Sequence, residues 1–156
     1  SVRTAGYTMI PEITTIPLQF DAPLAGEIFL IARVLFGGLM VFMGINHFLD
    51  AESMAGYAEM KGVPAPSLSV VLSGGLLVVA GAGIALGAYP VLAAGALVVF
   101  LLVTTPVMHD FWAVPEDQKQ SEMTSFLKNV QLIAASLAFL GLAAVEWPYA
   151  VGVGFL

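Results

Sequence analysis

The chain has 156 residues, of which 59% are hydrophobic and only 10% are charged, and its formal net charge is −6. A soluble domain carries roughly a quarter charged residues, so a soluble fold has too few polar groups here to cover the apolar surface. Five basic against eleven acidic residues argue against a nucleic-acid partner, and the lack of cysteine excludes disulfides and iron–sulfur clusters within the chain. The composition predicts an integral membrane protein, and its acidic balance fits a halophilic source.

Residues 1–25 form the first segment, which three prolines interrupt at Pro11, Pro17 and Pro23. Proline breaks helices and favours extended or turn backbone. We predict an extended N-terminal arm that lies on the rest of the protein or on a neighbouring subunit. A loose tail is the alternative.

Four apolar runs follow the arm, and each is as long as the roughly 20 residues that a membrane-spanning helix needs. They are residues 26–49, 67–88, 89–112 and 125–147. Ser67 and Ser125 are candidate N-caps, and Pro90 suits a first helical turn. The sequence predicts an all-α, antiparallel four-helix bundle across the membrane over residues 26–149, followed by a short tail at 150–156.

Antiparallel spans place both termini on one side, the termini side, and the loops 50–66 and 113–124 on the other, the loop side. The loop side carries Lys61, Lys119 and Lys128, whereas the termini side carries Arg3 alone. Because positive residues favour the cytoplasm, we expect both loops to be cytoplasmic.

Polar residues gather where three of the spans reach the loop side. The first span ends with His47, the third contains Thr105, His109 and Trp112, and the fourth begins with Lys128, Asn129 and Gln131. Ionisable groups at membrane depth are costly and usually face the bundle interior or water. We therefore predict one binding pocket formed by these seven residues. The alternative is that they mark the membrane interface, where tryptophan concentrates and lysine snorkels.

Arg33 lies about two helical turns inside the first span. One face of that helix carries Arg33, Gly37, Met40, Gly44 and His47. This face suggests a headgroup or substrate channel that leads from a buried cation to the polar cluster. Alternatively, Arg33 is structural and pairs with Glu27, Glu146 or backbone carbonyls, while the glycines are seams for close helix packing.

Other cofactor sites are less favoured. His47 and His109 are the two histidines, and a haem between them has no further signature to support it. The sequence has no carboxylate–histidine cluster at zinc or di-iron spacing and no glycine-rich phosphate loop, so we predict no metal site.

Five segments occur in an order and spacing that resemble the DoxX family of small four-helix membrane proteins, over about residues 28–142. They are ARVLFGGLMVFMGINHF, GYAEMKGVPAP, LSGGLLVVAGAGIALG, HDFW and FLKNVQLIAASLAF. The sequence departs from the family pattern at Ser73 and its two preceding residues, where a glutamate is often found, and at His47, where lysine is common. Both departures weaken the transfer of a proton-handling role.

The resemblance implies a quinone-linked or thiosulfate:quinone oxidoreductase subunit, or a part of a membrane oxidoreductase complex. On that reading a quinone is the cofactor, its isoprenoid tail lies on the glycine-lined face, and electrons come from a redox partner protein. The catalytic candidates are then His109, His47 and Lys128, which would bind a quinone carbonyl and supply protons. The alternative is a non-catalytic structural or assembly subunit, or a homo-oligomer; a small-solute carrier comes third.

Overall fold

The computed structural model describes residues 20–154, and within them all regular structure is helical. The helices are α1 (Ala25–Leu49), α2 (Ala51–Met60), α3 (Pro66–Leu86), α4 (Pro90–Met108) and α5 (Glu116–Leu142). Four of them, α1, α3, α4 and α5, are long and apolar enough to cross a membrane. This confirms the predicted all-α membrane fold. The predicted arm lies outside the described residues as far as residue 19.

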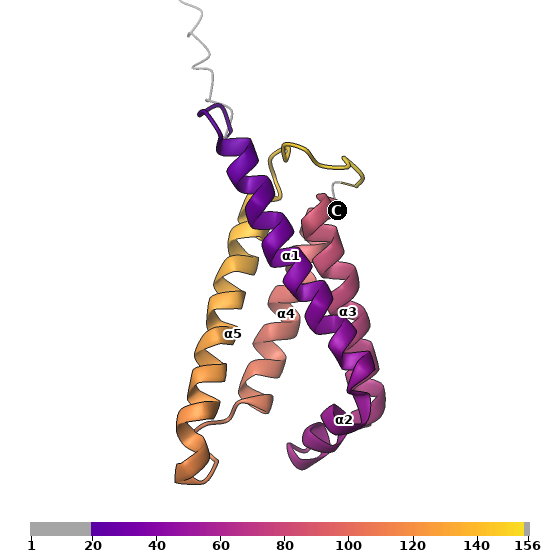
Figure 1. The fold of residues 1–156 in the computed structure, drawn as a ribbon, viewed down its shortest axis with the longest axis vertical. Helices are drawn as coiled ribbons and strands as arrows, with labels where there is room; N and C mark the ends of the chain where they lie inside the picture. The colour runs from indigo at the N-terminus through magenta and orange to yellow at the C-terminus, as the bar shows by residue number, and fades with distance from the viewer. Residues whose placement is uncertain (1–19, 155–156) are drawn as a thin grey trace, which may run out of the picture.

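The four long helices form two pairs, in which α1 packs along α3 and α4 packs along α5 (Figure 1). The pairs lie close together on the termini side, where both ends of the described chain are found, and they separate towards the loop side. The short helix α2 and the α4–α5 connection lie on the loop side, so the loops and termini are on opposite sides as the span count predicts.

Glycines bring α1 and α3 into backbone contact. A Cβ atom on Gly37 would lie 2.3 Å from the carbonyl oxygen of Gly81, and one on Gly44 would lie 2.7 Å from that of Gly74. In lipid, such small residues let helices pack closely without a hydrophobic driving force. The predicted channel along this face of the first span is therefore wrong, because α3 occupies the face.

Two helix starts differ from the prediction. Helix α5 begins at Glu116 with Pro115 as its N-cap, not at Ser125, because acidic residues in its first turn favour the positive end of the helix dipole. Helix α3 begins at Pro66, with Ala65 rather than Ser67 at the N-cap. The predicted first-turn position of Pro90 is confirmed.

Two further differences concern the loop side. Helix α4 ends at Met108, so His109, Asp110 and Trp112 lie in the α4–α5 connection rather than on the third span. The first loop contains α2, which buries Ala55 and Ala58 against Val70 of α3. It was missed because ten residues of modest hydropathy give no spanning signal.

Candidate functional site

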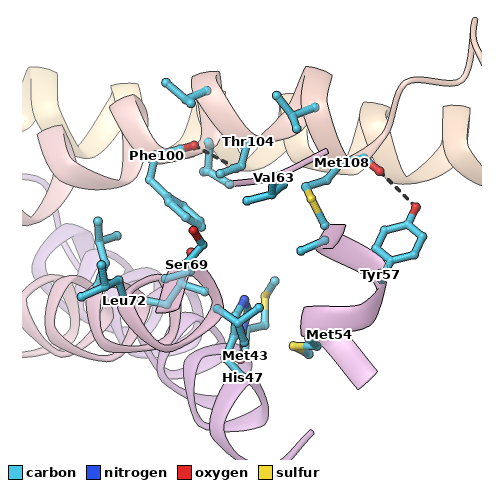
Figure 2. A pocket seen from close by; sticks show the side chains of 18 of the residues that line it. Met43, His47, Met54, Tyr57, Val63, Ser69, Leu72, Phe100, Thr104 and Met108 are labelled. Carbon is cyan, nitrogen blue, oxygen red and sulfur yellow. Dashed lines mark hydrogen bonds between the residues drawn. The ribbon is translucent and has the colours of Figure 1, made fainter. Parts of the chain in front are cut away.

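A pocket of about 950 Å³ lies between the two helix pairs on the loop side. Figure 2 shows α4 along one wall, α1 and α3 along the other, and α2 across one end. Most of its lining is apolar and includes four flexible methionines, Met40, Met43, Met54 and Met108. Methionine thioethers adapt to irregular ligands, so this wall can fit an apolar molecule of variable shape.

Two kinds of polar group interrupt the apolar lining: hydroxyls that already donate to the backbone, and histidine and asparagine side chains. The hydroxyls of Thr104 and Ser69 donate to backbone carbonyls at 2.8 Å, those of Phe100 and Pro64, so their donors are already used. His47, His109 and Asn129 also line the pocket. Nδ1 of His47 lies 2.8 Å from the carbonyl oxygen of Met43, so in a neutral ring Nδ1 carries the hydrogen and Nε2 is left as an acceptor.

A hydrogen-bonded chain of three side chains joins α2 to α5 at the loop-side end of the pocket. The Tyr57 hydroxyl lies 2.8 Å from Oε1 of Glu122 and 3.1 Å from the carbonyl oxygen of Met108. These two acceptors share the single hydrogen that the hydroxyl can donate. The other carboxylate oxygen, Oε2, lies 3.0 Å from Nδ1 of His109. Burial and then the hydrogen bond to Glu122 raise the pKa of Tyr57 above its ordinary value of 10.0.

An ion pair between Lys61 and Asp110 makes a second link across the same end. The hydrogen bond from Lys61 holds the pKa of Asp110 below its ordinary value of 3.8. Burial lowers the pKa of Lys61, but its contacts with Asp110 and Tyr57 outweigh burial and leave that pKa above 10.5. The pair therefore stays charged over the whole neutral range.

The structure brings together three of the predicted site residues in the large pocket: His47, His109 and Asn129. Thr105 is buried beside it, and its neighbour Thr104 lines the wall instead. Trp112 is 58% exposed and stacks on other aromatic rings outside the pocket.

Lys128 and Gln131 are exposed on a different face of α5, where they line a second pocket of about 440 Å³. Met43, His109 and Asn129 line both pockets and form the wall between them. The polar cluster expected as one site is thus divided between two.

Arg33 lies on the termini side, fully buried, with its guanidinium 5.4 Å from the ring centroids of Phe29 and Trp147. Its Nη2 donates to the carbonyl oxygen of Tyr149 at 3.3 Å, whereas Nε and Nη1 have no hydrogen-bond partner among residues 20–154. Glu27 instead accepts a hydrogen bond from the Tyr149 hydroxyl at 2.9 Å. The backbone carbonyl contact is one that the structural reading of Arg33 predicts, and a role of Arg33 in ligand binding stays a prediction.

Two residues of the site, Tyr57 and Glu122, were missed from the sequence. A helix started at Glu116 would have shown that Glu122 and Asn129 are seven residues apart and share a face. Tyr57 has no comparable signal, because its position depends on how α2 folds back across the bundle.

Comparison with known proteins gives one assignment. The family model DoxX matches residues 28–110, more than half of the chain. Comparisons with curated proteins and with solved structures gave no match. With the family model and four helices able to span a membrane, the chain belongs to the DoxX family and is a multi-pass membrane protein.

Proposed function

We propose that this protein binds a quinone in the large pocket and serves as the quinone-binding subunit of a membrane oxidoreductase system. The supporting observation is the shape and polarity of that pocket, which is apolar along the spans and carries His47, His109 and Asn129 at its loop-side end. A molecule with a polar ring and a long apolar tail matches this division, because binding sites combine apolar walls with a few converging polar groups.

The lining residues fit such a ligand. The Asn129 amide offers a donor for a ring carbonyl, and Nε2 of His109 offers a second one when the imidazole is protonated on both nitrogens. Leu72 of α3 and Val103 of α4 line the pocket and are also more than half exposed, on surfaces that face lipid. The rim between α3 and α4 therefore lets an isoprenoid tail continue into the bilayer.

A bound quinone supplies two-electron, two-proton redox chemistry. This chain has no cysteine for an iron–sulfur cluster or a thiol relay. We therefore assign electron exchange to a partner protein that carries a flavin or a metal redox centre. The residues of this chain bind the ring, orient it and shield it from water.

The alternative is an oligomer whose subunits pack through glycine faces, but the glycines of the spans do not need a second subunit as their packing partner. Gly37, Gly44, Gly74 and Gly81 are used within one chain, in the seam between α1 and α3. The pocket, by contrast, is a volume of about 950 Å³ that no described side chain fills, which favours ligand binding over a purely structural role.

The test is equilibrium binding of a short-tailed quinone to the purified protein in lipid nanodiscs, with organic extraction and mass spectrometry to find any quinone that co-purifies. We expect saturable binding near one quinone per chain, weakened about tenfold or more in His109→Gln, the loss expected for one strong polar contact. Lys128→Gln alters only the second pocket and should keep the wild-type affinity. Absence of saturable binding would refute the proposal.

A further inference from the structure

Glu122 is an acidic residue in the polar loop-side part of α5, held between two polar partners. Its oxygens lie 2.8 Å from the Tyr57 hydroxyl and 3.0 Å from Nδ1 of His109, and its side chain is 17% exposed. A carboxyl group that is only 17% exposed is costly unless it has partners or a function, so its place on α5 needs a reason. Packing does not supply one, because a glutamine would make similar contacts without the charge.

The two ends of the Glu122–His109 pair face different surroundings. His109 lines the large pocket, and because its Nδ1 is turned towards Glu122, Nε2 is the nitrogen left for a ligand. Glu122 belongs to the second turn of α5, close to the polar residues Glu116–Gln120 that begin the helix on the loop side. The pair therefore extends from the part of the large pocket that would hold the polar ring of a ligand to the water on the loop side.

We propose that Glu122 and His109 form a proton-exchanging pair that connects loop-side water with the polar ring of the ligand in the large pocket. This inference rests on the proposed function, because it assigns a role towards the quinone. The Tyr57 hydroxyl positions the carboxylate by occupying Oε1, so that Oε2 remains directed at the imidazole.

Each proton transfer in this pair breaks one bond to hydrogen and forms another. When Glu122 is ionised, Nδ1 of His109 carries a hydrogen and Nε2 accepts a hydrogen bond from a ligand hydroxyl. If Nε2 takes that proton, Nδ1 passes its own proton to Oε2, and the carboxyl group releases it to water. In the reverse direction, protonated Glu122 returns a proton to Nδ1 and Nε2 donates to a ligand carbonyl. Electrons pass separately to or from the flavin or metal centre of the partner protein.

This exchange makes the pocket selective for the redox state of its ligand. With the pair deprotonated, Nε2 is an acceptor and favours the hydroxyl of a quinol. With one more proton, Nε2 is a donor and favours the carbonyl of a quinone. Quinone affinity should therefore fall relative to quinol affinity as pH rises through the titration of the pair, by at most about tenfold per pH unit for one proton.

The other charged groups around the pair are Lys61, the C-cap of α2, and Asp110 from the α4–α5 connection. They form an ion pair with each other that stays charged across the neutral range. Their electrostatic effect on Glu122 and His109 therefore does not change with pH in that range. The phenol of Tyr57 titrates above 10.0 and does not contribute to a titration at neutral pH.

The experiment measures the affinities of a short-tailed quinone and of its quinol, under anaerobic conditions, between pH 5 and pH 9 for the full chain in nanodiscs. Glu122→Gln is compared with Glu116→Gln, the same change at a 90% exposed carboxylate of the same helix. In the wild type and in Glu116→Gln we expect the quinone-to-quinol affinity ratio to depend on pH. In Glu122→Gln the midpoint of this pH dependence should differ from that of the other two proteins, because an amide replaces the carboxylate beside Nδ1 of His109.

A readout independent of ligand affinity is the ¹⁵N chemical shift of His109, which reports the proton on each ring nitrogen. Tyr57→Phe, which leaves the charge of Glu122 intact, should shift the midpoint less than Glu122→Gln. A wild-type affinity ratio that is independent of pH while quinone binds would overturn the proton path and leave the proposed function intact. No quinone binding at all would overturn the proposed function itself.

Discussion

At the scale of single residues, the ion pair of Lys61 and Asp110 ties α2 to the α4–α5 connection. Asp110 has a lowered pKa, so its contribution to stability is present above the unfolded value near 3.8 and is lost as pH falls through the folded pKa. Lys61 has a raised pKa, so its contribution is present below 10.5 and is lost as pH rises through the folded pKa. The pair stabilises the attachment of α2 between those limits.

We expect Lys61→Gln to speed backbone amide exchange in α2 at pH 7, by roughly two- to fivefold, which is the range for partly exposed ion pairs. Hydrogen exchange followed by mass spectrometry measures this. The same substitution should change nothing at a pH below the folded pKa of Asp110, where the pair is already broken. Equal acceleration at both pH values would contradict the assignment to the ion pair.

At the scale of helices, adjacent glycines of α1 have opposite surroundings. A Cβ atom on Gly37 would meet the backbone of α3 at 2.3 Å, whereas one on Gly38 would have nothing within 4 Å. We expect Gly37→Ala to cost about 1–3 kcal/mol, as overpacking does, and Gly38→Ala to be neutral or slightly stabilising. Thermal unfolding in detergent separates the two. Equal effects would mean that the seam is not as tight as the backbone contact indicates.

The direction in which each side chain points around its helix also explains which parts of the site could be predicted from the sequence. Long apolar runs determine the spans because a bilayer admits helices of a minimum length, and the order of the spans brings His47, His109 and Asn129 to one pocket. Consecutive residues of a helix point about 100° apart, so of Lys128, Asn129 and Gln131, which all line the second pocket, only Asn129 also reaches the large one. Only tertiary packing decides that Asn129 reaches the large pocket and that Glu122, seven residues earlier on the same face of α5, contacts Tyr57 and His109.

At the scale of the whole molecule, the two helix pairs are clamped on the termini side and spread on the loop side (Figure 1). The clamp consists of the tilted and edge-to-face rings of Phe29, Phe139 and Trp147, with the buried Arg33 beside Phe29 and Trp147. Beyond Trp147 the C-terminal segment pairs with the α3–α4 turn, where Val151 donates to Leu86 and Tyr89 donates to the carbonyl of Val153, each at 2.9 Å. A pocket between the spread ends can stay open because this end holds the pairs together.

The clamp gives a prediction on the two tryptophans of the chain. Trp147 is 5% exposed, donates from its indole to the carbonyl oxygen of Leu142 at 2.8 Å and has its ring centroid 5.4 Å from the guanidinium carbon of Arg33, whereas Trp112 is 58% exposed. We expect Trp147→Ala to destabilise the protein by about 3–5 kcal/mol, the cost of removing a buried aromatic side chain, because it leaves a cavity beside a buried charge. Trp112→Ala should cost less than about 1 kcal/mol.

Unfolding in detergent, followed by circular dichroism, measures both variants, and quinone binding adds a second comparison. Because the clamp lies at the opposite end from the pocket, Trp147→Ala should weaken quinone binding only under conditions in which part of the protein is unfolded. If it weakened binding while the protein remained folded, the termini side would control the spacing of the helix pairs on the loop side as well as their stability. If Trp112→Ala proved the more damaging change, the helix pairs would be held together chiefly on the loop side, and the pocket would be the more rigid end of the molecule.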